Sequence, residues 1–279
     1  MKYRKVVIIG MGLIGGSIGK ALIARKLAKE VIGVCRRKSS LSRAFKEKAL
    51  TGGFVKNYRI AVKNADIIVI ATPVASICNV LAELNGIVGP DSILTDAGST
   101  KEMIVSCAAK YRKTYSFVGS HPLAGSEKTG VEFSESSLFS GSLCVVTRGL
   151  FTRQKDIEKI KIFWRALGAE VKVLAPHEHD EKLAFTSHLP HAIAYAMAGS
   201  MKNSYAPYAA TGFKDTTRIA SSDPVLWTSI FLSNPDNLAL SMKTFKTVLL
   251  SIEKAIRNKD EKSLRKILFQ CKGLKDAIG

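Results

Sequence analysis

The feature that most constrains this chain is a glycine pattern between a strand and a helix. Gly10, Gly12 and Gly15 have the G-x-G-x-x-G spacing, after a β-branched run and before a helical stretch. The first glycine allows a tight turn, the second lets a ligand approach the backbone, and the third lets the helix pack closely on the strand. The free N–H groups at the helix start attract phosphates. The pattern predicts a dinucleotide site with contacts from Gly10, Gly12, Leu13, Ile14 and Gly15.

Short β-branched runs alternate with helical stretches through the first 175 residues. This alternation predicts an α/β fold, with a doubly wound, mainly parallel Rossmann-type sheet and helices on both faces. The predicted strands are residues 6–9, 31–34, 67–71, 92–95, 117–118, 143–147 and 171–174. The predicted helices are residues 13–27, 39–49, 76–84, 101–112 and 152–167.

From residue 176 onward the sequence predicts only helices. Asp223 and Asn234 each precede a proline, a pattern typical of a helix N-cap. Apolar residues recur at three- and four-residue steps from Leu238 to Ile256, which forms one stripe of a long helix. This stripe is either buried within its own domain or packed against a second subunit, and we favour the subunit. We therefore expect a dinucleotide-binding domain over residues 1–175 and an all-helical substrate and dimerisation domain over residues 176–279, which forms a homodimer.

The second predicted strand ends without the carboxylate that NAD-specific sites place there for the ribose hydroxyls. Cys35 stands at that point, and Arg36, Arg37 and Ser39 follow it. A guanidinium group pairs well with a 2′-phosphate, whereas the alternative is a solvated basic loop. We therefore favour NADP over NAD as the cofactor.

Two further segments follow predicted strands at the same edge of the sheet. Thr72 and Pro73 come after the third strand, and Asp96-Ala97-Gly98-Ser99 after the fourth. Doubly wound sheets bind ligands at the carboxyl ends of their strands. We therefore expect both segments to contact cofactor or substrate.

The charge and cysteine content narrow the partners. Lys and Arg number 42 against 23 Asp and Glu, a net charge of +19 that attracts anions. Nucleic-acid binding requires a basic stripe with interleaved aromatics, whereas these charges are spread along the chain. No run is apolar enough to span a membrane. The five cysteines have no C-x-x-C or metal-finger spacing. We therefore expect a small anionic partner, no nucleic acid, membrane or metal, and free thiols in the cytoplasm.

His121 follows the fifth predicted strand, so it should project at the same edge. Removing a hydride from an alcohol carbon requires a group that takes the hydroxyl proton, and a neutral imidazole suits this task near neutral pH. A single histidine in a loop is often structural. Three polar clusters accompany this one: SHLPH at residues 187–191, KDTTR at residues 214–218, and Trp227.

With these motifs the chain resembles the prephenate and arogenate dehydrogenases of tyrosine biosynthesis over essentially its whole length. The runs SHPLAGSEKTG, SHLPH and GFKDTTRIASSDPVLW are similar to signatures of that family, in its order and at comparable spacing. The resemblance implies oxidative decarboxylation of a small dicarboxylate, a cyclohexadienol, with hydride transfer to NAD(P). Aromatisation of the ring supplies driving force, so neither a metal nor a covalent intermediate is implied.

The resemblance also implies roles for individual residues. His121 is expected to deprotonate the ring hydroxyl, helped by a hydrogen bond from Ser99. Arg218 is expected to hold the ring carboxylate through its bidentate fork, oriented by Asp215. The rest of the substrate pocket is expected to include Ser126, Glu127, His188, His191, Lys214 and Trp227.

Two other functions remain open from the residues alone. One is a two-domain β-hydroxyacid dehydrogenase, for which Lys214 is the candidate base. The other is a non-enzyme that senses dinucleotides or binds nucleic acid through its positive charge. Release of carbon dioxide separates the first from the tyrosine-pathway reaction, and salt-sensitive DNA binding without turnover would favour the second.

Overall fold

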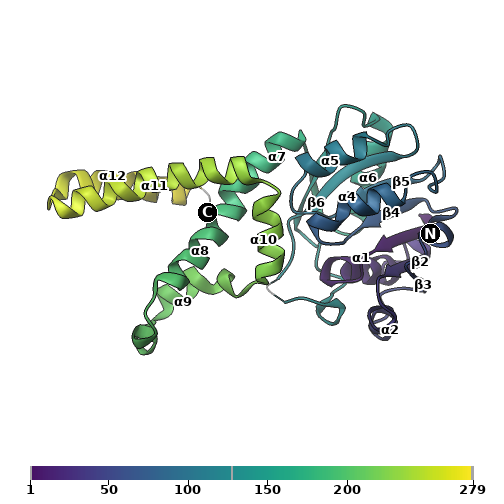
Figure 1. Ribbon diagram of the computed structural model, residues 1–279, viewed down its shortest axis with the longest axis horizontal. Helices are drawn as coiled ribbons and strands as arrows, with labels where there is room; N and C mark the ends of the chain where they lie inside the picture. Colours follow the sequence, from purple (N-terminus) through teal and green to yellow (C-terminus); the bar gives the residue numbers. More distant parts are fainter. Residues whose placement is uncertain (1, 127, 278–279) are drawn as a thin grey trace. The chain divides into compact units, whose positions relative to one another are not determined.

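The computed structural model describes residues 2–126 and 128–277, and within them eight strands form one sheet. The strand order is β3-β2-β1-β4-β5-β6-β7-β8 (Figure 1). All neighbours are parallel except β6 and β7. The strands are β1 (Tyr3–Ile9), β2 (Ala28–Cys35), β3 (Gly52–Val55), β4 (Ile67–Ile70), β5 (Ile93–Asp96), β6 (Ser116–Pro122), β7 (Leu143–Thr147) and β8 (Glu170–Leu174). The predicted doubly wound, mainly parallel sheet is confirmed.

Helices cover both faces of the sheet, so two hydrophobic cores form. One core includes side chains of α1, α2 and α6, and the other includes side chains of α3, α4 and α5. Within β1, Val6 and Ile8 point into the first core while Val7 and Ile9 point into the second, because successive side chains of a strand alternate between faces. These helices are α1 (Leu13–Ala24), α2 (Lys38–Lys46), α3 (Tyr58–Val62), α4 (Val74–Glu83), α5 (Glu102–Ala109) and α6 (Gln154–Ala166).

The sequence did not predict β3 or α3. β3 reads GGFV and lies at the edge of the sheet, where it pairs only with β2. Two glycines in four residues give almost no propensity or alternation signal. Pairing with β2 therefore decides the structure of this segment, and the local sequence does not.

The region after β8 is helical, as predicted. A first compact unit extends to Asn234 and includes α7 (Pro176–Leu183), α8 (Leu189–Ser200), α9 (Thr211–Thr217) and α10 (Pro224–Leu232). The predicted N-cap of α10 is confirmed, since the Asp223 carboxylate accepts a hydrogen bond from Val225 N at 2.9 Å.

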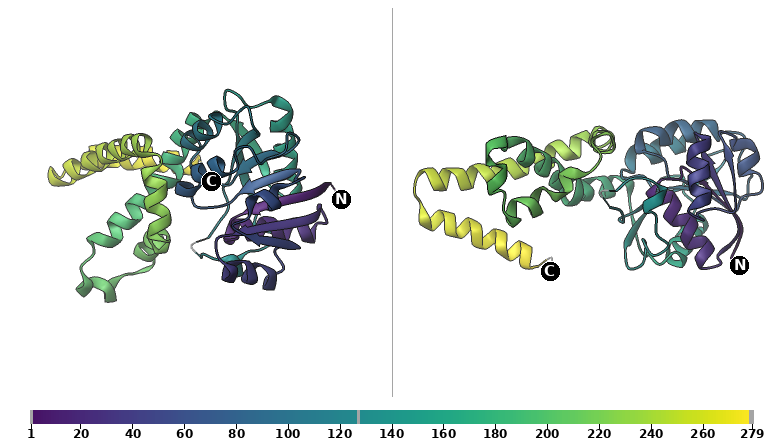
Figure 2. Two further views of the ribbon diagram at one scale, coloured as in Figure 1. Left: turned by 45° about the vertical axis from the view of Figure 1, so that its right-hand side comes forward. Right: turned by 90° about the horizontal axis from the view of Figure 1, so that it is seen from below.

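The second unit consists of α11 (Pro235–Arg257) and α12 (Glu261–Asp276). A short turn joins its two helices, which diverge from that turn (Figure 2). Asp260 caps α12, because its carboxylate accepts a hydrogen bond from Ser263 N at 3.0 Å. Exposed pairs four residues apart, such as Glu253 with Arg257, add modest support to each helix.

Two of the cysteines form a disulfide, so the expectation of free thiols was wrong for them. Cys78 on α4 and Cys107 on α5 are bonded, with their Cα atoms 5.8 Å apart. They are 29 residues apart in the sequence, and only the packing of both helices on one face of the sheet brings them together. Cys35, Cys144 and Cys271 are free, as expected.

We expect the double substitution Cys78→Ser, Cys107→Ser to lower the free energy of unfolding by about 2–4 kcal/mol. The bond restricts the unfolded chain across a 29-residue separation and so disfavours the unfolded state. Urea unfolding of the oxidised protein, the reduced protein and the variant measures the effect. Cys271→Ser is the control, because that cysteine is exposed and unpaired. Identical midpoints for oxidised and reduced protein would contradict the expectation.

Candidate active site

The glycine loop between β1 and α1 has the geometry expected of a phosphate-binding turn. Gly10 has φ 99°, and a Cβ there would lie 2.6 Å from the carbonyl oxygen of Ala71. At Gly15 a Cβ would lie 1.9 Å from the carbonyl oxygen of Gly10. Gly12 differs, because a Cβ there would meet nothing within 4 Å. Gly10 and Gly15 thus permit close packing, whereas Gly12 faces open space.

Two further observations fit a bound dinucleotide. The N-terminus of α1 has no side-chain cap, so its N–H groups are available to a phosphate. Thr72, in the loop between β4 and α4, has a buried hydroxyl oxygen without a hydrogen-bond partner in the described chain. A buried hydroxyl normally has a partner, and a ligand at this edge would supply one. The residues present therefore fit a dinucleotide.

The end of β2 is basic and solvent-accessible, as the sequence predicts. Cys35 is buried, which raises the pKa of its thiol, whereas Arg36, Arg37 and Ser39 are exposed. Neither arginine forms an ion pair within the described residues. Both guanidinium groups therefore remain available to an anion.

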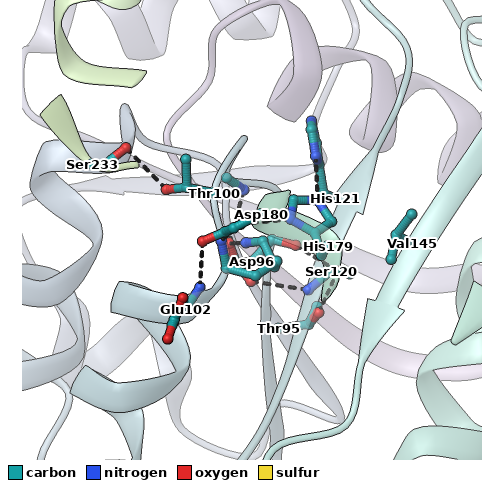
Figure 3. A network of polar contacts seen from close by, with 12 residues as sticks. Thr95, Asp96, Thr100, Glu102, Ser120, His121, Val145, His179, Asp180 and Ser233 are labelled. Carbon is teal, nitrogen blue, oxygen red and sulfur yellow. Dashed lines mark hydrogen bonds and ion pairs between the residues drawn. The ribbon is translucent and has the colours of Figure 1, made fainter. Parts of the chain in front are cut away.

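His121 lies near the end of β6 in a network of polar side chains (Figure 3). Its Nδ1 is 2.9 Å from Nε2 of His179, and Nδ1 of His179 is 2.7 Å from Oδ1 of Asp180. Both partners come from α7. The Asp180 carboxylate also accepts hydrogen bonds from the backbone N–H groups of Lys101 at 2.7 Å and Glu102 at 2.9 Å. The start of α5 thus fixes the carboxylate, and the carboxylate orients the two imidazoles.

This chain of hydrogen bonds determines which nitrogen of His121 can act as a base. An ionised carboxylate only accepts, so Nδ1 of His179 carries the proton and donates to Asp180. Nε2 of the neutral His179 then accepts, and Nδ1 of His121 must donate to it. The lone pair of His121 is therefore on Nε2, the nitrogen not used in the network.

A buried ion pair lies next to the network that contains His121. The ammonium group of Lys101 contacts the carboxylate of Asp96, and both side chains are fully buried. Asp96 also accepts hydrogen bonds from the backbone N–H groups of Gly98 at 2.8 Å and Ser120 at 3.0 Å. Asp96 therefore holds the loop after β5 against the strand that carries His121. The expectation that the segment from Asp96 to Ser99 contacts cofactor or substrate stays a prediction.

Burial keeps the central histidines neutral. It holds the pKa of His121 well below its ordinary value, and the electrostatic interactions of His121 with His179 and Lys101 act in the same direction. Burial also lowers the pKa of His179, although its hydrogen bond to Asp180 opposes this shift. For His188, burial lowers the pKa to about 4. Near neutral pH these imidazoles are therefore uncharged.

The histidines of the SHLPH motif pack on Trp227. His191 on α8 stacks on the Trp227 ring with 3.4 Å between ring centroids, and His188 meets the same ring edge-on at 6.3 Å. His188 ends a short π-helix, Ala184–His188, a distortion often found at functional sites. Its Nδ1 lies 3.3 Å from the amide nitrogen of Asn234, while its buried Nε2 has no partner within the described residues. Nε2 of His188 is thus a hydrogen-bond donor available to a ligand.

Arg218 follows α9 and is exposed. Its positive charge helps to lower the pKa of His191, behind burial as the main cause, so the guanidinium group lies near the His191–Trp227 stack. The predicted orientation by Asp215 is not found, since no ion pair or hydrogen bond joins Asp215 to Arg218 in the part of the chain that the structure describes. Lys214 and Asp215 are both exposed on α9.

For Ser99 and Ser126, the described residues show no hydrogen bond to His121. Ser99 is half-buried in the loop before α5, and no hydrogen bond joins it to His121 within residues 2–126 and 128–277. Ser126 is exposed, and its hydroxyl accepts a hydrogen bond from Lys128 N at 3.2 Å. Glu127 lies outside the described residues. The roles assigned to these three residues stay predictions.

Sequence reasoning missed His179 and Asp180, although a signal was present. They belong to the run PHEHDEK, which directly follows the last predicted strand. A histidine and an aspartate that follow a strand are candidates for the site on the same ground as His121. What the run does not reveal is its partner, since His121 is 58 residues away.

The described residues contain neither a metal-binding cluster nor a membrane-spanning helix. No group of three or more His, Cys, Asp and Glu side chains there is arranged to hold a metal ion. None of the helices there combines the length and apolar character that crossing a membrane requires.

A dinucleotide-binding turn and an oriented, neutral imidazole at one end of a Rossmann-type sheet define a nicotinamide-dependent dehydrogenase. Comparison with known families is more specific. The family model described as prephenate dehydrogenase, nucleotide-binding domain, matches residues 18–173. The model described as prephenate dehydrogenase, dimerization domain, matches residues 175–270. The chain belongs to the prephenate dehydrogenase family.

Individual relatives agree with this assignment. Prephenate dehydrogenase of Bacillus subtilis is 31% identical over 98% of this chain and 76% of its own length. Cyclohexadienyl dehydrogenase of Zymomonas mobilis is 32% identical over 92% of this chain and 90% of its own. The crystal structure of Aquifex aeolicus prephenate dehydrogenase with hydroxyphenyl propionate and NAD+ has a TM-score of 0.91 and 30% identity, covering 100% of this chain and 99% of that one.

Proposed function

We propose that this protein catalyses the oxidative decarboxylation of prephenate, arogenate or both, with hydride transfer to NAD(P). The observation that carries the proposal is the His121–His179–Asp180 chain, which leaves a lone pair on Nε2 of His121. Names of relatives support the substrate class, since they include prephenate and cyclohexadienyl dehydrogenases. The products would be 4-hydroxyphenylpyruvate from prephenate and tyrosine from arogenate.

The chain's own residues would perform the proton transfer and the positioning. The nicotinamide, when bound, accepts the hydride from the ring carbon that bears the hydroxyl group. Nε2 of His121 takes the hydroxyl proton, and the Asp180 carboxylate, acting through His179, stabilises the positive charge that develops. Arg218 holds the ring carboxylate, which leaves as carbon dioxide when the ring becomes aromatic. Ser99, Ser126, Glu127, His188, His191, Lys214, Asp215 and Trp227 are proposed to complete the pocket.

A four-way assay tests the proposal. Purified protein is mixed with prephenate or arogenate and with NAD or NADP, and the absorbance of the reduced nicotinamide is followed together with release of carbon dioxide. Absence of reduced cofactor in all four mixtures would refute the function. Reduction of cofactor by a β-hydroxyacid without carbon dioxide release would instead favour the alternative that uses Lys214.

We propose NADP as the preferred cofactor, supported by Arg36 and Arg37, which are exposed at the end of β2 and form no ion pair within the described residues. Replacing both with alanine is expected to raise KM for NADP by about 10- to 100-fold and KM for NAD by less than about twofold, because only NADP has the 2′-phosphate. Initial rates with each cofactor measure this. Arg43→Ala removes the same charge from the exposed face of α2 and is the control. Equal increases for both cofactors would contradict NADP preference.

We expect kcat/KM to fall as the pH is lowered, with an apparent pKa below 6.5, because a protonated His121 cannot accept a proton and burial depresses its pKa.

The free energy of unfolding should fall over the same pH range. The unfolded chain protonates its histidines near 6.5, whereas the pKa values of His121, His179 and His188 are lowered in the fold. Melting curves at each pH separate the two effects. An activity midpoint above 6.5 in folded protein would argue for a different base.

We propose a homodimer formed through the helical domain that begins at residue 176. The family model that matches residues 175–270 describes a dimerization domain. The hairpin of α11 and α12 also exposes large apolar side chains, among them Leu240, Leu249, Leu250, Leu268, Phe269 and Leu274. Exposed apolar surface of this extent is typical of interfaces.

We propose the cytoplasm as the compartment, because the reaction draws on the intracellular pool of nicotinamide dinucleotide. The Cys78–Cys107 disulfide is uncommon there, since cellular reductants keep most thiols reduced. Both cysteines are only partly exposed, which restricts the access of reductants.

A further inference from the structure

A pocket lies outside the polar network of His121. It has a volume of about 690 Å³, which falls in the usual range for small-molecule sites. Most of the residues that line it come from α5, the segment between α5 and β6, the loop between β7 and α6, and the start of α7. The residues that decide its chemistry are Arg112, Lys113, Arg148, Leu150, Phe151 and Arg153.

The pocket combines positive charge with an exposed aromatic surface. The guanidinium carbon of Arg112 lies 4.5 Å from the centroid of the Phe151 ring. Phe151 is 57% exposed and its neighbour Leu150 is 98% exposed, values that are high for large apolar side chains. A ligand with a planar apolar body would cover this surface.

Most of the positive charge in the pocket is not neutralised. Arg153 pairs with the buried carboxylate of Asp156. Arg148 donates a hydrogen bond to the uncharged amide of Gln154. Within the described residues, none of Arg112, Lys113 and Arg148 forms an ion pair. Glu102 is the single acidic residue among those that line the pocket. An anionic group is therefore the complementary ligand chemistry.

We propose that this pocket binds a small organic anion with a planar aromatic body, at a site separate from the one that contains His121. The aromatic body would stack over Phe151 and Leu150, and the anionic group would pair with Arg112, Lys113 and Arg148.

The position of the pocket links it to catalysis. Glu102 lines it, and the backbone N–H of Glu102 donates to the Asp180 carboxylate. Pro176 and His177 also line it and begin α7, the helix that carries His179 and Asp180. A bound anion thus contacts both elements that position the partners of His121, and we infer that it changes kcat. This coupling rests on the proposed function, whereas the binding itself does not.

Binding is tested with the fluorescent aromatic sulfonate anilinonaphthalene sulfonate, added to the full chain in saturating NADP so that the dinucleotide site is occupied. We expect a saturable fluorescence increase from one site. Phe151→Ala and Arg112→Ala should each weaken binding by about tenfold. Both side chains are exposed, so neither change should unfold the protein. Lys155→Ala is the matched control, since it removes a charge from the exposed face of α6 outside the pocket and should leave affinity unchanged.

The outcomes are distinct. Equal binding by the wild type, Phe151→Ala and Arg112→Ala would overturn the site, as would the absence of any fluorescence increase in saturating NADP. Coupling is tested by measuring kcat against probe concentration in the wild type and in Phe151→Ala. A change in kcat that disappears in Phe151→Ala supports it, and an unchanged kcat at saturating probe overturns coupling while leaving the binding site intact. If the four-way assay detects no activity, the fluorescence experiment still decides whether the site exists.

Discussion

Replacing His121 with asparagine is expected to lower kcat by about 10²–10⁴-fold and to change KM by less than about threefold. Asparagine keeps a polar side chain of similar reach but cannot take a proton. Because Nε2 of His121 is the nitrogen left out of the hydrogen-bond chain, the substitution removes the proton acceptor. The loss should therefore occur in the chemical step.

Steady-state kinetics with the preferred substrate and cofactor measure the effect. His177→Asn is the control, because this histidine is exposed on α7, two residues before His179, and the pocket that it lines holds no added anion in this assay. Thermal melting of both variants shows whether folding is intact. Loss of the pH dependence below neutral pH in His121→Asn would identify His121 as the titrating group. A kcat within about threefold of the wild type in folded protein would remove His121 from the mechanism.

Asp180 acts on His121 through His179, so its substitution should affect the reaction indirectly, through the position of His121. Asp180→Asn replaces a carboxylate, which only accepts hydrogen bonds, with an amide that also donates. The tautomer of His179 is then no longer fixed, and one of the two oxygens that accept from the backbone N–H groups of Lys101 and Glu102 is lost. Both effects follow from one carboxylate. This dual role explains why Asp180, a buried residue, matters to the position of the base.

The sequence predicted those parts of the site that depend on local geometry. The roles of Gly10 and Gly15 follow from a strand, a turn and a helix that are contiguous in the chain, and their close contacts with backbone atoms agree with the prediction. His121 was likewise placed at the sheet edge because its strand precedes it directly. Such inferences need only the period of the pattern and the rules for parallel sheets.

The parts that could not be predicted depend on contacts between distant segments. His121 meets His179 only because β6, β7 and β8 are adjacent and α7 returns toward the sheet edge. The Asp96–Lys101 pair is close in sequence, but its complete burial follows from packing around it. Cys78 and Cys107 are likewise distant in the sequence, and only the packing of α4 and α5 brings them together. Spacing alone contains no information about such pairs.

Replacing Arg218 with alanine is expected to raise KM for the substrate by about 10²- to 10³-fold, with a smaller effect on kcat. The guanidinium group has no carboxylate partner within the described residues and lies near the His191–Trp227 stack, so a substrate carboxylate would supply its partner. Arg218→Lys should recover part of the affinity, because lysine keeps the charge but loses the bidentate fork.

Initial rates over a wide range of substrate concentration measure KM and kcat separately. Lys202→Ala is the control, since it removes an exposed positive charge from the helical region, where the ammonium group lies over the ring of Tyr205. The ring carboxylate that Arg218 would hold is the group that leaves, so a tighter grip on it would stabilise the ground state and slow the reaction. Solvent weakens an ion pair at an exposed position such as that of Arg218, which limits this cost. If Arg218→Ala changed kcat and left KM as in the wild type, the arginine would act on the departing group and not on binding.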